Sequence, residues 1–98
     1  MATPLKVGAP ASWAGKYVES LTEAYTCVKG DCGKVFLLTG AFNVTLTAAD
    51  LGSGWHATFI NVSGNSTVNS VAMTAASDYV NVVSNGTAIY NAGSLATA

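Results

Sequence analysis

The sequence predicts an all-β fold, a small β-sandwich or β-barrel of jelly-roll-like type with an extended N-terminal arm. Two observations support this fold class. Turn-forming residues recur about every 8 to 12 residues, and the runs between them are rich in β-branched and aromatic side chains with no convincing helical stretch. In addition, Asn85-Gly86 separates two such runs, which favours a hairpin with a type I′ turn. The length of 98 residues fits one domain.

Residues 1–15 are expected to form the arm, and residues 16–98 a single β domain. Four structure-breaking residues punctuate the first segment: Pro4, Gly8, Pro10 and Gly15. The segment nevertheless carries large apolar side chains without a core of their own, so we expect it to lie on a neighbouring subunit or a larger surface. The expected interface residues are Leu5, Val7, Trp13 and Tyr17. The alternative is a tail that contacts nothing.

The β domain divides into eight expected strands, in chain order 16–21, 24–28, 34–39, 42–47, 55–62, 67–73, 79–84 and 87–91. The first of these alternates weakly and could instead be one turn of helix. Residues 34–39 are apolar on both faces, which is typical of a strand covered on both sides. Residues 42–47 alternate between apolar and polar side chains, which predicts a half-buried strand. The loop at residues 48–54 could hold one helical turn ended by glycine.

Charged residues are scarce, since only nine of 98 are Lys, Asp or Glu. A folded chain of 9.9 kDa exposes roughly 5,200 Å², so the surface holds about one charge per 600 Å². Outward strand positions are expected to carry Thr, Ser and Asn. Both prolines lie within residues 1–15, so the edge strands lack the charges and prolines that normally prevent edge-to-edge pairing. We therefore expect other subunits to cover part of the surface.

Composition argues against nucleic-acid and membrane partners. The net charge is −1, arginine is absent and the four lysines are scattered, whereas a nucleic-acid binder needs a clustered basic face. The longest purely apolar run near the middle of the chain, residues 35–38, is far too short to cross a bilayer. Glycine and proline interrupt the N-terminal segment, so we expect no cleaved signal peptide.

Two cysteines, Cys27 and Cys32, flank an expected turn at residues 29–31. They could remain reduced thiols, or they could form a disulfide across the turn if their Cβ atoms come close enough. A zinc site is a third interpretation, but two cysteines supply only half of four ligands and the single histidine, His56, does not complete the set. We expect no metal and no cofactor.

No set of residues predicts catalysis. A triad of His56 with Asp50 or Asp78 and a serine is conceivable, but the Gly-x-Ser-x-Gly motif is absent and a surface or interface histidine is the better interpretation. Glu19 and Glu23 are interpreted as solvated loop charges rather than as paired catalytic carboxylates. We therefore expect that the protein is not an enzyme and has no catalytic residues.

A Gly-Lys pair introduces the apolar run that ends at residue 38, and Val-Thr-Leu-Thr follows at residues 44–47. A Gly-Trp pair then opens residues 54–61, which end in Asn, and Asn85-Gly86-Thr87 precedes the aromatic Tyr90. This series, from residue 24 to residue 90, resembles a recurring module of tailed-bacteriophage virion proteins. Thr47 stands where the module usually has a proline, which leaves the following loop less rigid.

The resemblance implies a capsid decoration (cement) protein, a β-rich and usually trimeric accessory protein without enzymatic activity. The expected partners are the major capsid protein and further copies of the chain, and the expected location is the capsid surface of the virion after synthesis in the host cytoplasm. The alternative is a head- or tail-fibre domain that binds a receptor or glycan, with Trp55, Tyr79 and Tyr90 as surface aromatics that stack on sugars. Decoration is favoured because the chain lacks the internal repeats of fibres.

Overall fold

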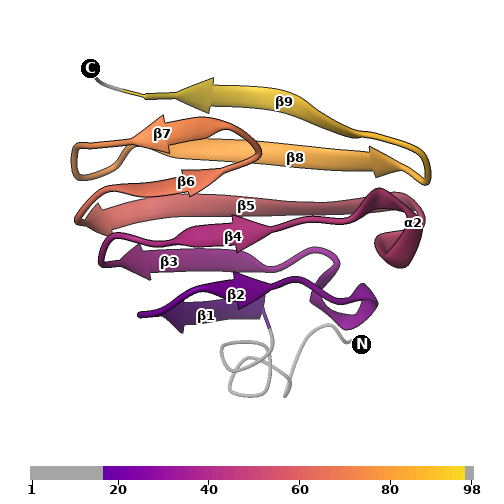
Figure 1. Ribbon diagram of the computed structural model, residues 1–98, viewed down its shortest axis with the longest axis horizontal. Helices are drawn as coiled ribbons and strands as arrows, with labels where there is room; N and C mark the ends of the chain where they lie inside the picture. The colour runs from indigo at the N-terminus through magenta and orange to yellow at the C-terminus, as the bar shows by residue number, and fades with distance from the viewer. Residues whose placement is uncertain (1–16, 97–98) are drawn as a thin grey trace, which may run out of the picture.

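The computed structural model describes residues 17–96, which fold into two β-sheets packed face to face (Figure 1). The five-stranded sheet has the order β1-β3-β5-β8-β9, with β1 Val18–Leu21, β3 Val35–Thr39, β5 Ser53–Ser63, β8 Tyr79–Asn85 and β9 Ile89–Leu95. The four-stranded sheet has the order β2-β4-β6-β7, with β2 Tyr25–Thr26, β4 Asn43–Thr45, β6 Ser66–Val68 and β7 Val71–Met73. The predicted all-β sandwich is confirmed, and residues 17–96 form no closed barrel. The predicted arm, residues 1–15, lies outside the described residues.

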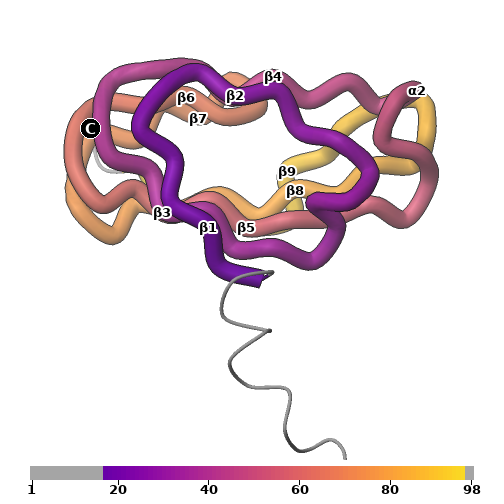
Figure 2. Tube along the Cα trace, turned by 90° about the horizontal axis from the view of Figure 1, so that it is seen from below, coloured from indigo at the N-terminus to yellow at the C-terminus, as the bar shows by residue number. Residues whose placement is uncertain are grey.

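Neighbouring strands are parallel over much of both sheets, in contrast to the antiparallel pairing of a jelly roll. Strands β1, β3 and β5 run parallel, as do β2, β4 and β6, whereas β8, β9 and β7 pair antiparallel with their neighbours. Parallel neighbours need a crossover connection. Here the crossover is a strand of the other sheet, because the chain alternates between the sheets. Seen along the stack of strands, the path is a flattened coil (Figure 2).

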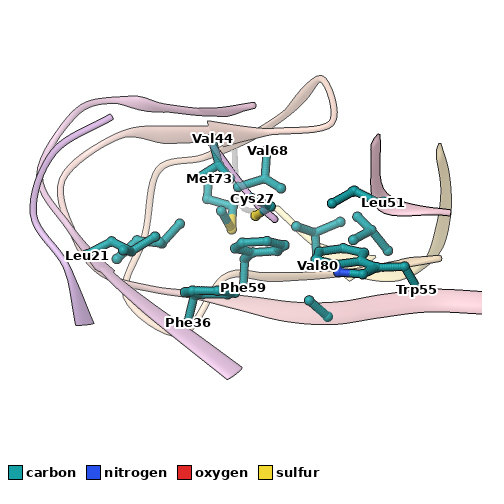
Figure 3. Close-up of a cluster of buried hydrophobic side chains, with 13 residues drawn as sticks. Leu21, Cys27, Phe36, Val44, Leu51, Trp55, Phe59, Val68, Met73 and Val80 are labelled. Atoms are coloured by element: carbon teal, nitrogen blue, oxygen red, sulfur yellow. The ribbon is translucent and has the colours of Figure 1, made fainter. Parts of the chain in front are cut away.

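The core lies between the sheets and is made by every second residue of the long strands, as the period of two in a strand requires. Phe59 of β5 stacks on Phe36 of β3 with ring centroids 5.0 Å apart. Figure 3 shows Phe59 in the middle of the core, with Val68 and Met73 of the four-stranded sheet on its other side. The buried cluster comprises Leu21, Cys27, Phe36, Leu38, Val44, Leu51, Trp55, Ala57, Phe59, Val68, Met73, Val80 and Val82.

The predicted hairpin of the C-terminal segment is confirmed by the antiparallel pairing of β8 and β9. Its turn differs from the prediction, because Gly86 has a positive φ of 89° and Asn85 does not. The central residues are therefore Gly86 and Thr87, with glycine first, as in a type II′ turn. The side-chain Oδ1 of Asn85 accepts hydrogen bonds from the N–H groups of Thr87 and Ala88, each at 2.8 Å. This side chain fixes the start of the turn.

A turn with two positive φ values, the type I′ requirement, joins β6 to β7 instead. Its central residues are Asn69 (φ 48°) and Ser70 (φ 67°), so the predicted single strand over residues 67–73 is two short strands.

The loop at residues 48–54, which was predicted to hold one helical turn, contains the short helix α2, Ala48–Leu51. The turn between the cysteines is the 3₁₀ helix η1, Lys29–Asp31.

At one end of the coil, successive turns stack backbone on backbone. Gly40 connects β3 to β4, and Gly64 connects β5 to β6. A Cβ atom on Gly64 would lie 2.6 Å from the carbonyl carbon of Gly40 and would collide with its oxygen. Two hydrogen bonds hold the stacked turns together, from Gly40 N–H to the oxygen of Ser63 at 2.9 Å and from Ser66 Oγ to the oxygen of Gly40 at 2.8 Å. Only glycine permits this close approach.

Candidate functional site

The outward side of the five-stranded sheet carries a largely apolar surface. The strand register arranges its side chains in rows across the sheet. The first row is Ser20, Leu37, Ile60, Tyr79 and Leu95; the second is Val18, Val35, Thr58, Asn81 and Gly93; the third is His56, Val83 and Tyr90. These three rows, together with Val62 of β5, are named the apolar face.

No described element covers the apolar face, since residues 17–96 form two layers and no third (Figure 2). Leu95 and Tyr90 near its margin are 52% and 53% exposed. Central residues such as Leu37 and Ile60 are half-buried. Neighbouring rows in a sheet stand close enough to shelter one another, so this partial burial does not require a covering layer.

Among residues 17–96, charged side chains are absent from the apolar face. Glu19 lies on the inward side of β1, in register with Phe36, and its carboxylate binds Lys34 at 2.8 Å. The other charged residues of this range lie in turns, connections or α2: Glu23, Lys29, Asp31, Lys34, Asp50 and Asp78. The face therefore presents hydrocarbon, hydroxyl and amide groups and a single imidazole.

The four-stranded sheet presents a different surface. Its outward positions are Thr26, Asn43, Thr45, Thr67 and Ala72. Hydroxyl and amide groups bind water without charge, so this side is suited to solvent. The prediction that outward positions carry Thr, Ser and Asn is correct for this sheet. It holds only in part for the five-stranded sheet, where Ser20, Thr58 and Asn81 share the outward side with apolar residues. The two-sided apolar pattern of residues 34–39 was the signal of the apolar face in the sequence.

A buried carboxylate stabilises the end of the sandwich where η1 leads from β2 to β3. Asp31 is 2% exposed, and it accepts hydrogen bonds from Tyr25 Oη at 2.8 Å and from Val28 N–H at 3.0 Å. Lys34 Nζ lies 3.0 Å from its other oxygen. Burial raises the pKa of Asp31, but these three donors outweigh burial and hold the pKa below its ordinary value. This cluster is a structural anchor.

The same cluster raises the pKa values of the two side chains that donate hydrogen bonds to Asp31. Burial and the hydrogen bond to Asp31 raise the pKa of Tyr25 to about 12. The hydrogen bonds that Lys34 donates to Glu19 and to Asp31 raise its pKa. The Lys34 ammonium also lies 5.9 Å from the centroid of the Phe36 ring, which is within cation–π range. Each group is thereby held in the protonation state that its partner needs at neutral pH.

Both cysteines are free thiols, so the disulfide alternative is not the arrangement found. Cys27 is buried, and burial raises its pKa to about 12, whereas Cys32 is exposed. The Sγ of Cys32 lies 3.7 Å from Nδ1 of His56, and the same nitrogen lies 3.2 Å from the oxygen of Gly54. Sequence spacing could not show this contact, because it depends on the pairing of β3 with β5.

The carboxylates considered as partners of His56 lie elsewhere. Asp78 is 1% exposed and accepts hydrogen bonds from the N–H groups of Thr74 and Ala75, each at 3.0 Å, which makes it a turn-stabilising residue. Asp50 lies in α2. No three His, Cys, Asp or Glu side chains of residues 17–96 are grouped so that they could hold a metal ion.

The three expected surface aromatics, Trp55, Tyr79 and Tyr90, differ in burial. Trp55 is 3% exposed and belongs to the core, where its indole N–H donates to the oxygen of Val28 at 3.0 Å. This burial is a correction: Trp55 begins the inward alternation of β5 and cannot stack on a ligand. Tyr79 and Tyr90 do lie on the apolar face.

Of the four predicted interface residues, Tyr17 is described and is 46% exposed just before β1. The other three, Leu5, Val7 and Trp13, lie outside the described residues.

Within the described range, no helix has the length and apolar character needed to cross a membrane. Comparison with known proteins finds no matching family model, no matching curated protein and no matching solved structure.

Proposed function

We propose that this protein is a bacteriophage capsid decoration protein, a virion component without enzymatic activity that binds the outer surface of the head and stabilises it as a homotrimer. The major capsid protein is its proposed partner, and the capsid surface its proposed location. The resemblance of residues 24–90 to phage virion modules supports this function. The observation that carries it is the two-sided character of the sandwich, with an uncharged apolar face opposite a face of hydroxyls and amides.

The size of the apolar face supports a role in assembly. Five strands about 4.8 Å apart span about 20 Å, and seven residues of strand span about 23 Å, so the face covers roughly 450 Å². The largest apolar patch on a typical monomer covers about 300–600 Å² and is often functional. A face of this size is therefore a candidate contact surface for an assembly.

We assign the capsid contact to residues 1–15, on the basis of their sequence. Burial of about 400 Å² of apolar surface by Leu5, Val7, Trp13 and their neighbours would contribute roughly 10 kcal/mol. Ordering about 15 residues would offset most of this gain. Tight binding therefore requires several arms of one oligomer to bind a repeating lattice together.

Sedimentation with decoration-free heads of the virus that encodes the chain tests this function. The full chain should pellet with heads in a saturable, stoichiometric manner. A variant lacking residues 1–15 should remain in the supernatant while it keeps the circular dichroism of the full chain. Absence of pelleting by the full chain, or equal pelleting by the truncated variant, would contradict the assignment. Binding to host cells or to a glycan array without binding to heads would favour the fibre alternative.

A further inference from the structure

We propose that Asn85 is a self-modifying residue of the folded protein, whose side-chain amide is converted into a carboxylate with the help of the turn between β8 and β9. The inference concerns the chemistry of this turn and stands independently of the proposed function. The chain has seven asparagines, and Asn85 is the one that glycine follows.

The reaction joins the side chain of Asn85 to the main chain of Gly86. The Gly86 nitrogen loses its proton to hydroxide or water and attacks Cγ of Asn85, so that a C–N bond forms and negative charge moves to Oδ1. Breakage of the Cγ–Nδ2 bond then releases ammonia, which takes its last proton from water, and leaves a five-membered cyclic imide. Water opens this imide to aspartate or isoaspartate. The net change is the uptake of one water and the loss of one ammonia.

The turn holds the reacting amide over the nucleophile. Oδ1 of Asn85 accepts hydrogen bonds from the N–H groups of Thr87 and Ala88, each at 2.8 Å. Both donors follow Gly86 in the chain, so the side chain is folded back over the Gly86 peptide. The same two donors contact the oxygen on which negative charge develops, and N–H groups so placed stabilise an oxyanion.

The reacting atoms are open to water. Asn85 is exposed and Gly86 is half-buried. Glycine has no side chain that would hinder attack by its own nitrogen. The leaving atom, Nδ2, lies 3.4 Å from Oη of Tyr90, which is 53% exposed. Hydroxide can therefore reach the site, and ammonia can leave it.

Asn91 of β9 provides an internal comparison. It is exposed like Asn85, but the next residue is Ala92, whose methyl group crowds the nitrogen that would attack. Its Oδ1 accepts an N–H from Gly93 at 3.0 Å. Asn91 therefore has a similar side-chain hydrogen bond without an unhindered nucleophile.

The product carries a negative charge beside the apolar face. Asn85 alternates with Asn81 and Val83 along β8, so it lies on the outward side, at the end of the face. Aspartate keeps the two backbone donors as charge-assisted hydrogen bonds, whereas isoaspartate lengthens the main chain at the start of the turn. The conversion thus brings charge to a surface that has none among residues 17–96.

One contact opposes the reaction. The Gly86 N–H donates a hydrogen bond to Oγ of the buried Ser84 at 3.1 Å, and the attack requires this N–H to lose its proton. Ser84→Ala removes the acceptor and leaves the donors to Oδ1 in place. This variant should convert Asn85 faster than the wild type.

Incubation of the folded chain in mildly alkaline buffer, followed by peptide mapping with mass spectrometry, tests the proposal. Asn85 should convert at least about tenfold faster than Asn91. Thr87→Pro removes one of the two N–H donors, and Thr87→Ala keeps it. Proline fits this position because the preceding Gly86 has a φ of 89° and lies outside the right-handed helical region.

Thr87→Pro should convert at least about threefold more slowly than Thr87→Ala, a smaller effect than the roughly 10²–10³-fold of a donor in an active site because the turn is exposed. In urea, where the turn is absent, the two variants should convert at equal rates. Circular dichroism checks that all variants are folded in buffer, and should Thr87→Pro unfold, the test of the turn rests on Ser84→Ala.

Three results would overturn the proposal. The first is conversion of Asn85 no faster than that of Asn91. The second is equal rates for folded Thr87→Pro and Thr87→Ala, or the same difference between them in urea, because the turn would then have no part in the reaction. The third is conversion in Ser84→Ala that is no faster than in the wild type.

Discussion

Replacement of Gly64 by alanine tests whether the stacked turns at one end of the coil stabilise the fold. The new Cβ would lie 2.6 Å from the carbonyl carbon of Gly40 and still closer to its oxygen, and Gly64 has a φ of 87°, which strains any other residue. Gly54 is a matched control. Its φ is 91°, and a Cβ placed on it meets nothing within 4 Å.

The difference between the two variants measures the close approach of the turns. The left-handed conformation costs alanine about 1–2 kcal/mol, and this cost applies to both Gly54→Ala and Gly64→Ala. In Gly64→Ala the two turns must also separate, which disturbs the hydrogen bonds that link Gly40 to Ser63 and to Ser66. Each is worth about 1 kcal/mol, so Gly64→Ala should lower the free energy of unfolding by about 3–4 kcal/mol in total.

Urea unfolding followed by circular dichroism measures both free energies. All chains should be compared at one protein concentration, because association of copies would raise the apparent stability of the folded state. Equal m-values for wild type and variants would show that the free energies can be compared directly. A loss for Gly64→Ala within about 0.5 kcal/mol of the loss for Gly54→Ala would refute the reasoning, because strain alone would then explain both.

Two further predictions concern the end of the sandwich near η1. Asp31→Asn should lower the free energy of unfolding by about 2–3 kcal/mol at neutral pH, because the amide loses charge-assisted hydrogen bonds from Tyr25 and Lys34. The folded pKa of Asp31 lies below 3.8, so its contribution is present above that value and is lost as the pH falls through the folded pKa. Urea unfolding at about pH 2.5 should therefore show a smaller difference between variant and wild type, and an undiminished difference would contradict the role of the charge. A thiol reagent should label exposed Cys32 rapidly and buried Cys27 only on unfolding, as mass spectrometry can count. Rapid labelling of Cys32→Ser would show that Cys27 is accessible.

The sequence was sufficient for the strands whose local pattern is strong. Residues 42–47 and 55–62 alternate, and both contain strands in the structure. Asn85-Gly86 correctly predicts a hairpin but not its turn type, because the position of the turn depends on which residues pair across β8 and β9. The type I′ turn at Asn69-Ser70 carries a weaker signal, since serine seldom adopts a positive φ.

Strand order and the contacts between strands could not be predicted from local sequence patterns, because they depend on residues that are distant in sequence. The contact of Cys32 with His56 illustrates this limit, because it exists only where β3 and β5 are neighbours. Trp55 is different. The alternation of residues 55–62 places Trp55 on the same side of the strand as Ala57 and Phe59, so a local pattern does indicate its burial.

The alternating path of the chain explains why the molecule has two unlike faces. Strands β3, β5 and β8 carry apolar residues on both sides, whereas β4 and β6 carry apolar residues on one side and Thr or Asn on the other. These two kinds of strand largely alternate along the sequence. From β1 to β6 the chain passes to the other sheet at each strand, and this path collects the first kind of strand in one sheet and the second kind in the other. If β3 to β6 paired in chain order instead, both kinds would mix within each sheet, and neither outer face would be largely apolar. The two-sided apolar pattern of single strands is visible in the sequence, but only the topology shows that these strands lie side by side in one sheet.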